Sequence, residues 1–399
     1  MASKSFSKEE WKTINRLLDK DPALYGFPER TYDTALLCSF NIRKLGSSRN
    51  RSKETWEFLA RICRQFDLIA VQEILDDLSG ITELMDLIGD EFGLVLSDRT
   101  GVFPGDRGVG ERLGFVFRWS LVERGKVISD ITFDRSKIIE TIASNYHVFH
   151  SAMQPYAEKY EKYLAGQRNK PKNVNLPVFL SFIRQPYCVS FRIKGYPGTK
   201  PYEFMAVNAH LYFGNYIDDR RQEFFALMNW IMERFKTGEN VYFPNFVLLG
   251  DLNLDYDNPK KDRARIEEII KNYDKDGQEI IHPEVDINVN FPFLDVHYRE
   301  KSVFKTNARL DETFDQIGLF FKDPEVGWPS YKDNAKLGTS ASIADYGVFN
   351  FVNLFREALN IKKGVHQMNK SEKKAFYDKF QHKVSDHMPL WLRLPLPKK

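Results

Sequence analysis

Two apolar runs that meet clusters of polar residues constrain this chain most. Residues 245–249 lead into Gly250-Asp251-Leu252-Asn253, and residues 384–390 contain Ser385-Asp386-His387. A buried strand has no structural need for charged groups at its tip, whereas strand ends hold side chains rigidly at the rim of a sheet. Carboxylates beside an amide and an imidazole suit a hard divalent cation and proton transfer. The two runs therefore predict a sheet with reactive groups at its rim.

Bulk composition narrows the class of protein without identifying a partner. The 399 residues allow one large domain or two to three small ones, and the net charge of +3 is too small to indicate a polyanionic partner. The three cysteines, Cys38, Cys63 and Cys188, have no metal-binding spacing, and their small odd number favours a reducing compartment. No run approaches about 18 apolar residues, so no membrane span is expected. We therefore expect a cytoplasmic protein.

Strand and helix patterns alternate along one continuous stretch, which predicts a layered α/β sandwich. Residues 1–34 are expected to form an N-terminal helical extension, in which Ser7 and Glu10 have capping-box spacing. Residues 35–399 are expected to form one catalytic domain, with helical insertions near 136–172, 258–297 and 353–383. The predicted strands are 35–42, 67–73, 115–118, 188–193, 204–211, 246–252, 314–321 and 390–394, and the predicted helices include 53–66, 80–92 and 224–235.

Several of these strands carry single polar residues that are ambiguous one by one. Asn41 ends the first strand and Glu73 the second. Alone, the amide more often caps a turn and the carboxylate is more often a solvated charge, but together they suit Mg²⁺ or Mn²⁺. A histidine inside an apolar strand, such as His210, is more often a core residue. If Glu111 orients its ring through one nitrogen, the other nitrogen is available for proton transfer.

The aspartates after residue 250 resemble the start of an EF-hand loop, but Tyr256 occupies the position that requires glycine and Pro259 interrupts the loop. Asp251 and Asn253 alternate along an extended chain, so both are expected on one face, as in an active-site pair. Arg184 stands at the start of a strand, where a guanidinium either grips a phosphate or is a surface charge.

Two further patterns concern polymer binding. Five cations stand within eleven residues, which suits a polyanionic backbone, although a bare charge run is more often a solvated loop. These cations are Arg43, Lys44, Arg49, Arg51 and Lys53. Tyr156, Tyr160 and Tyr163 have helical spacing, and we favour packing over base stacking for that stripe.

The order of these motifs resembles the endonuclease/exonuclease/phosphatase superfamily and, within it, deoxyribonuclease I-like nucleases. The resemblance covers roughly residues 36–394, and it rests on residues 39–46 (SFNIRKLG), 111–118 (ERLGFVFR) and 184–186 (RQP), and on the sequence of polar strand ends. It implies a four-layer α/β sandwich with two mostly antiparallel sheets and one active site at the rim.

The resemblance also implies a role for each matched residue. Glu73, Asn41 and Asp386 would hold or neighbour Mg²⁺ or Mn²⁺, and an additional structural Ca²⁺ is left open. Glu111 would orient His210, and Asp315 would orient His387. Asp251 and Asn253 would bind the metal or the attacking water. The phosphate contacts would come from Arg184, Thr306 and Arg43, with Thr306 resting only on its position before Asp315.

The activity implied is metal-assisted hydrolysis of a phosphodiester, as an endonuclease acting on DNA, with RNA left open. One imidazole or Asp251 would take a proton from water and the other imidazole would protonate the leaving oxygen. Leu75 and Val109 stand where deoxyribonuclease I contacts the groove with Arg and Tyr, so the grip on a duplex is expected to differ. The helical insertion before Lys172 is an alternative source of that grip.

A phosphatase of inositol polyphosphates or phospholipids is the leading alternative. That group carries Trp-Cys-Asp-Arg where this chain has Thr313-Phe314-Asp315-Gln316. An abasic-site endonuclease and a non-catalytic interaction protein are the remaining alternatives, and the second is disfavoured because no catalytic position is lost.

Overall fold

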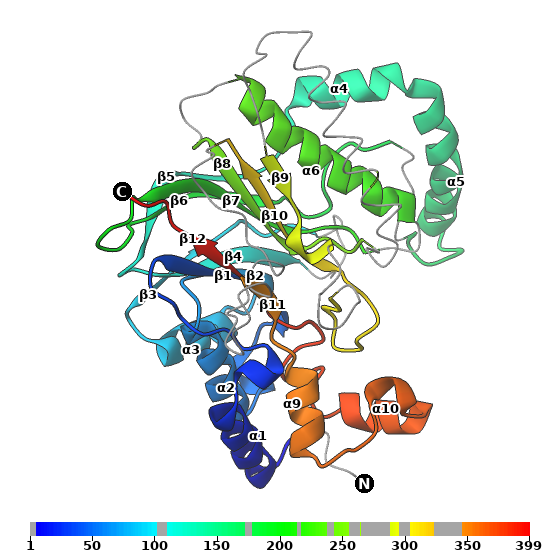
Figure 1. Cartoon of the computed structure of the whole chain (residues 1–399). Coiled ribbons are helices and arrows are strands. Elements are labelled where there is room, and N and C mark those ends of the chain that lie inside the picture. The colour runs from blue at the N-terminus through cyan, green and yellow to red at the C-terminus, as the bar shows by residue number, and fades with distance from the viewer. Residues whose placement is uncertain are drawn as a thin grey trace.

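Two six-stranded sheets lie face to face at the centre of the protein (Figure 1). The computed structural model describes residues 5–101, 110–171, 178–213, 217–237, 243–254, 264, 288–294, 304–322 and 345–399. The first sheet has the order β11 (Tyr346–Val348), β12 (Leu390–Pro395), β1 (Thr34–Leu45), β2 (Leu68–Leu75), β4 (Glu111–Arg118) and β3 (Phe92–Leu96). The second has the order β5 (Val122–Asp130), β6 (Tyr187–Ile193), β7 (Tyr202–His210), β8 (Asn245–Asp251), β10 (Asp315–Phe321) and β9 (Asn288–Asn290).

Helices flank the sheet pair on both outer sides (Figure 1). Beside the first sheet lie α1 (Lys8–Lys20), α2 (Lys53–Arg64), α3 (Ser79–Ile88), α9 (Phe351–Ala358) and α10 (Lys370–Tyr377). Beside the second lie α4 (Arg135–Ser144), α5 (Tyr146–Leu164) and α6 (Ile217–Thr237). Short 3-10 helices span Ala23–Tyr25, Ser48–Asn50, Pro292–Leu294 and Val365–Gln367. The predicted four-layer α/β sandwich is confirmed.

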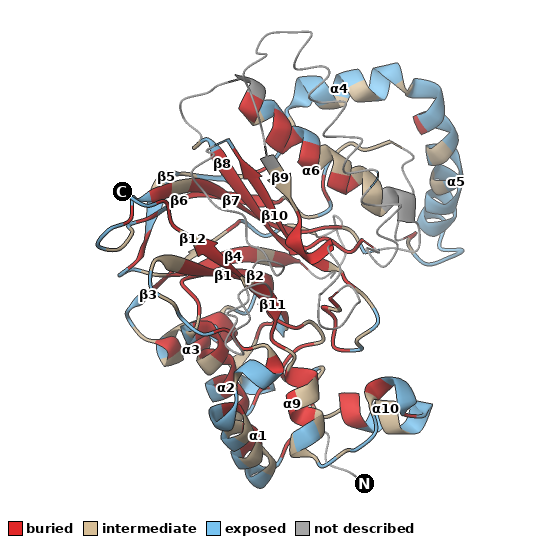
Figure 2. Cartoon of the chain, viewed as in Figure 1, coloured by how far each residue is buried: buried red, intermediate tan, exposed pale blue. Residues whose placement is uncertain are grey.

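Alternation along the strands of the second sheet separates two cores. Phe204 and Ala206 of β7 belong to the cluster between the sheets, whereas Met205 and Val207 belong to the cluster under α6. This follows from the two-residue period of a strand, which sends successive side chains to opposite faces. Buried residues accordingly run along both sheets, while α4 and α5 are mostly exposed (Figure 2).

Each sheet contains one parallel pair of neighbouring strands, β1 with β2 and β7 with β8, and the other described pairs are antiparallel. The prediction of mostly antiparallel sheets is therefore confirmed. Parallel neighbours end at the same edge of a sheet, so the carboxyl ends of both strands in each pair lie side by side. Each pair thus presents two adjacent strand ends to the rim.

The N-terminal helix forms as its sequence predicts. The Glu10 amide donates to Ser7 Oγ (3.2 Å), and the Ser7 amide donates to Glu10 Oε2 (2.7 Å). These reciprocal bonds satisfy two amides that have no partner inside the helix. Trp11 and Leu18 of α1 are buried in the core cluster that includes the first sheet, so α1 packs on the sandwich.

Some element predictions were wrong or incomplete. The helix expected over residues 80–92 ends at Ile88, because Gly89 takes φ 97° and the chain then starts β3 at Phe92. The strands β3, β5, β9 and β11 were not predicted. Of these, β9 and β11 have three residues each, too few to show a period, and β5 is largely exposed and polar.

The expected insertions have different fates. Residues 353–383 contain α10 and most of α9, and they bury Phe355, Phe376 and Phe380 in the main core cluster. Residues 258–297 lie mostly outside the described residues.

No described helix combines the length and hydrophobicity that crossing a membrane requires.

The tyrosine stripe of α5 does not pack into the core, contrary to our sequence interpretation. Tyr160 and Tyr163 keep 36% and 37% of their surface exposed. Tyr156 and Tyr160 instead contact each other, with ring centroids 6.1 Å apart and planes 17° apart. Because Phe149 is the one described residue of α5 that is buried, this helix projects from the sandwich.

Candidate functional site

The carboxyl ends of the two parallel pairs meet across the sheets. The Asn41 side chain in β1 donates through Nδ2 to Glu73 Oε1 of β2 (3.2 Å) and to Asp251 Oδ2 of β8 (3.0 Å). One amide therefore links a carboxylate of its own sheet to a carboxylate of the facing sheet. His210, at the end of β7, pairs with Asp251 in the parallel register.

A backbone irregularity aims Glu73 at this meeting point. The pairing of β2 with β4 shifts between Val71 and Ile74, and Glu73 has φ 62°. A bulge of this kind redirects a side chain, and a left-handed glutamate is strained by an amount on the order of 1–3 kcal/mol. The Lys44 amide, itself from a residue with φ 46°, donates to Glu73 Oε2 (2.8 Å). Both strand ends are thus distorted so that Glu73 faces Asn41.

The groups around Glu73 fit a hard divalent cation. Among the described residues, Asn41 Oδ1 and Asp386 Oδ1 are buried without a hydrogen-bond partner. Burial alone would raise the pKa of Glu73, but His210, the Lys44 amide, His387 and the Asn41 amide together lower it, so Glu73 is held as a carboxylate. Amide and carboxylate oxygens are the ligands that Mg²⁺ and Mn²⁺ prefer.

Asp386 also forms an ion pair with Arg43. Burial raises the pKa of Asp386, and the His387 and Arg43 charges oppose that rise. A phosphate contact by Arg43, as expected from the sequence, would therefore compete with an existing carboxylate partner.

His210 lies between two carboxylates. Its Nδ1 is 2.6 Å from Glu111 Oε1, and its Nε2 is 3.6 Å from Asp251 Oδ2. Burial and the charge of Arg184 lower the pKa of His210, but Glu111 and Asp251 outweigh them and raise it overall. Glu111, at 1% exposed, therefore fixes the ring and leaves Nε2 facing the site.

Arg184 contacts both Glu111 and the backbone at the end of β7. Its Nε pairs with Glu111 Oε1, and its Nη1 donates to the carbonyls of His210 (3.3 Å) and Leu211 (3.0 Å). The guanidinium therefore holds Glu111 and the end of β7. Only the groups not used in these contacts are left for the phosphate contact expected of Arg184.

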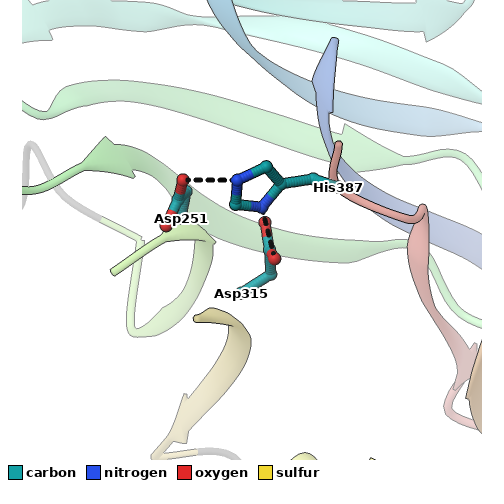
Figure 3. A group of neighbouring side chains, drawn as sticks. All are labelled: Asp251, Asp315 and His387. Carbon is teal, nitrogen blue, oxygen red and sulfur yellow. Dashed lines mark hydrogen bonds and ion pairs between the residues drawn. The ribbon is translucent and has the colours of Figure 1, made fainter. Parts of the chain in front are cut away.

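His387 repeats the arrangement from the other side (Figure 3). Its Nδ1 is 2.8 Å from Asp315 Oδ2, and its Nε2 is 3.5 Å from Asp251 Oδ2. Burial lowers the pKa of His387, but the charges of Asp315 and Asp251 raise it well above its usual value. Both imidazoles thus turn Nε2 toward the same oxygen of Asp251.

Thr306 stands behind Asp315 and not at the rim. Its hydroxyl donates to Asp315 Oδ2 (2.7 Å) and accepts from the Asp315 amide (3.1 Å), and the residue is fully buried. The phosphate contact that the resemblance implies for Thr306 does not agree with this position. Thr306 instead orients the carboxylate that orients His387.

Asp251, Asp315 and His387 also have ligand atoms within 4.8 Å of one another, close enough for a metal site. A histidine ligand needs a neutral ring with a free lone pair. Both nitrogens of His387 face carboxylates, and its raised pKa favours the charged ring. This group therefore suits proton transfer better than metal binding.

Asn253 reaches the site by a route that differs from the prediction. Strand β8 ends at Asp251, and Asn253 takes φ 52°, so the two residues do not alternate along one extended strand. The Asn253 amide donates to Asp251 Oδ1 (3.1 Å), and its side-chain Nδ2 donates to the Leu211 carbonyl (2.9 Å). Asn253 thus closes a turn that joins the ends of β7 and β8.

The basic segment is divided between structure and surface. Arg51 is 7% exposed, donates to the carbonyls of Lys383 (2.8 Å) and Arg43 (2.5 Å), and covers the Trp56 ring at 5.2 Å. The interpretation of Arg51 as a backbone-tracking cation is therefore wrong. Lys44, Arg49 and Lys53 are exposed.

Sequence reasoning missed a polar bridge between the sheets. Gln72 Nε2 donates to Asn208 Oδ1 (2.7 Å), and Asn208 Nδ2 donates to the carbonyls of Val71 (3.0 Å) and Gly114 (2.9 Å). All these groups are buried, next to Glu73 in one sheet and two residues before His210 in the other. The available signal was a lone amide inside each of two apolar strands.

Comparison with known proteins concerns fold. No family model matches the sequence, and no curated protein matches it significantly. An endonuclease/exonuclease/phosphatase family protein from Bacteroides thetaiotaomicron has 13% identity and a TM-score of 0.44, over 92% of this chain and 98% of that chain.

This chain is similar in fold to endonuclease/exonuclease/phosphatase family proteins. A mannosyl-6-phosphatase of Bacteroides thetaiotaomicron matches with 12% identity and a TM-score of 0.43, over 90% of this chain and 99% of that chain. D. rerio TDP2 complexed with a single-strand DNA product matches with 11% identity and a TM-score of 0.42, over 90% and 98%. These neighbours include a phosphatase and a protein bound to DNA.

Proposed function

We propose that this protein is a divalent-metal-dependent phosphodiesterase that hydrolyses DNA as an endonuclease. One observation carries the proposal. Two imidazoles, His210 and His387, are each held through Nδ1 by a buried carboxylate, and both turn Nε2 toward Asp251 Oδ2, at 3.6 and 3.5 Å. Two oriented imidazoles that converge on one point suit a reaction that needs a base for water and an acid for the leaving oxygen.

The residues of the chain divide the chemistry between them. One imidazole, or Asp251, removes the proton from the attacking water, and the other imidazole protonates the leaving oxygen. Glu111 and Asp315 keep the two rings in position. Glu73, Asn41 and Asp386 would hold Mg²⁺ or Mn²⁺, which when bound stabilises negative charge on the phosphate oxygens.

The surface beside the site supports a polymeric substrate. Exposed Lys44 lies near the end of β1 and donates its amide to Glu73, and exposed Arg49 and Lys53 follow it along the chain. Cations in that position suit successive phosphates of a nucleic-acid backbone. The three cysteines are buried and free, in agreement with the proposed cytoplasmic location.

The test is hydrolysis by purified protein with Mg²⁺ of supercoiled plasmid, RNA and inositol polyphosphates. We expect nicking of the plasmid, loss of activity in EDTA, and recovery when Mg²⁺ is restored. Asp315→Asn, purified in parallel, controls for contaminating nuclease because it should lower the rate. Release of phosphate from inositol polyphosphates with intact plasmid would instead identify a phosphatase, and full activity in EDTA would reject the metal requirement.

A further inference from the structure

A buried glutamate on α6 binds two separate segments of the site. Glu223 is 5% exposed, and each of its carboxylate oxygens accepts a backbone amide. Oε1 accepts from Ile183 at 2.6 Å, and Oε2 accepts from Tyr212 at 2.6 Å. The site residues described above do not include Glu223, although it bridges the segments that carry Arg184 and His210.

The two amides flank the residues that matter most on this side. Ile183 immediately precedes Arg184, and Tyr212 stands two residues after His210. Arg184 in turn donates to the carbonyls of His210 and Leu211. Glu223 and Arg184 thus join the same two segments twice, which leaves the end of β7 and the Arg184 backbone little freedom to move apart.

Arg220 lies about one turn earlier on α6 and holds a third segment. Its Nη1 donates to the Asn253 carbonyl (2.8 Å). Asn253 is the left-handed residue whose side chain binds the Leu211 carbonyl. One end of α6 therefore contacts the segments of Arg184, His210 and Asn253 through Glu223 and Arg220.

A role in packing alone does not explain this carboxylate. Burying an ionisable group is costly, and apolar side chains of similar volume often stabilise a core more. Burial raises the pKa of Glu223 to about 7, although the two amides and the charges of Arg184 and His210 oppose that rise. Both oxygens already accept backbone amides, so Glu223 is also not placed to exchange protons with a substrate.

We propose that Glu223, assisted by Arg220, is a positioning residue that fixes Arg184 and His210 in the geometry required for phosphodiester hydrolysis. This inference rests on the proposed function. A glutamine at this position keeps the shape but has only one oxygen, so one of the two amides must lose its acceptor. The segment it held would then shift, and a misplacement of about 1 Å can cost on the order of 10²-fold in rate.

The first experiment compares Glu223→Gln with Glu233→Gln, an exposed glutamate on the same helix. Rates are measured on plasmid and on bis(p-nitrophenyl) phosphate, a small diester that does not depend on the basic segment. For Glu223→Gln we expect kcat to fall on both substrates by on the order of 10²-fold, with unchanged Mg²⁺ dependence and folding. Glu233→Gln should match the wild type. A Glu223→Gln rate within two-fold of the wild type would overturn the proposal.

The second experiment does not depend on catalysis. Amide hydrogen exchange is measured at Ile183 and Tyr212 in the wild type, Glu223→Gln and Arg220→Ala. We expect faster exchange of at least one of the two amides in Glu223→Gln, and faster exchange near Asn253 in Arg220→Ala, each beyond any change in the most protected amides. Unaltered exchange in both variants would show that α6 does not hold these segments. If the wild type hydrolyses no phosphodiester, the proposed function fails. The exchange measurement would still show whether Glu223 and Arg220 hold these segments.

Discussion

Asp251 is the residue at which the halves of the site meet. Its Oδ2 accepts from Asn41 Nδ2 at 3.0 Å and lies 3.6 and 3.5 Å from the Nε2 atoms of His210 and His387. Burial alone would raise the pKa of Asp251, but the two imidazoles and the Asn41 amide lower it, so the carboxylate stays charged. Both imidazoles are therefore held toward one anion, and we expect them to act together.

We expect His210→Ala and His387→Ala each to lower kcat by roughly 10²- to 10⁴-fold, the usual contribution of acid–base groups. Because groups that act together are strongly non-additive, the double variant should be little slower than the slower single variant. Cleavage rates of the three variants check this expectation. Losses that multiply in the double variant would show that the rings act independently, and a near wild-type rate in one single variant would remove that ring from the mechanism.

Glu223 predicts a dependence of stability on pH. Its folded-state pKa is raised from 4.5 to about 7, so the folded protein binds a proton that the unfolded chain has already released in that window. The stability that this contributes is complete below about pH 4.5 and is lost as pH rises through about 7. Glu223→Gln lacks the titration. The unfolding free energy of the variant minus that of the wild type should therefore be larger at pH 8 than at pH 5. The increase is up to about 3 kcal/mol, at 1.36 kcal/mol per unit of pKa shift.

Urea unfolding of the wild type, Glu223→Gln and Glu233→Gln at both pH values measures this difference. The exposed control should show no such change. An equal stability gap between Glu223→Gln and the wild type at pH 5 and pH 8 would contradict the raised pKa.

Residues 44–53, from the end of β1 to the start of α2, contain two kinds of cation. Arg51 is buried against Trp56 and anchors the chain to Lys383, whereas Lys44, Arg49 and Lys53 face solvent. The cations of this segment therefore have different roles. The buried guanidinium shapes the segment, and the exposed cations are the ones available to a phosphate backbone.

Replacing Lys44, Arg49 and Lys53 by Ala should weaken DNA binding most at low salt. Each lost phosphate contact should flatten the slope of log affinity against log salt by roughly 0.9 for duplex DNA. Hydrolysis of bis(p-nitrophenyl) phosphate should be nearly unchanged, since the cations lie outside the reacting groups. Affinity measured over a salt series is the test, and an unaltered slope would make the segment a solvated loop. Arg51→Ala should instead lower the unfolding midpoint, which separates the two roles.

The sandwich as a whole brings the site together because the strand ends come from both sheets. Asn41 and Glu73 belong to the first sheet, and His210, Asp251 and Asp315 belong to the second. The buried Gln72–Asn208 bond joins the sheets directly behind Glu73 and His210. Binding at the rim should therefore act on the stability of the entire fold.

We expect Mg²⁺ to raise the thermal midpoint of the wild type, because a ligand that binds only the folded state stabilises it. At a Mg²⁺ concentration of 100 times the dissociation constant the gain is about 2.7 kcal/mol. Glu73→Gln should fold normally, lose most of its turnover, and show little or no Mg²⁺-dependent rise. Calorimetry with Mg²⁺ and with EDTA tests this, and an equal rise in the variant would place the metal elsewhere.

Local patterns were sufficient for the architecture and for naming most of the polar residues that the fold brings together at the rim. Apolar runs bounded by polar residues identify eight of the strands, and the polar residues at or near their ends include Asn41, Glu73, His210, Asp251 and His387. This succeeds because a side chain at a strand end stays at the rim whichever strands are neighbours. The strands β9 and β11 were not predicted, because a strand of three residues is too short to show a pattern.

The tertiary structure alone decided which polar groups lie at the rim and which bind other groups inside the protein. Arg51 is an anchor because the carbonyl of Lys383, far away in sequence, accepts from it. Thr306 is buried because its hydroxyl donates to Asp315. The bulge that aims Glu73 depends on the register between β2 and β4, and the bond pair of Glu223 depends on how α6 packs beside β7. Partners distant in sequence leave no trace in a local pattern, because whether a buried polar group is satisfied depends on the strands and helices that close around it.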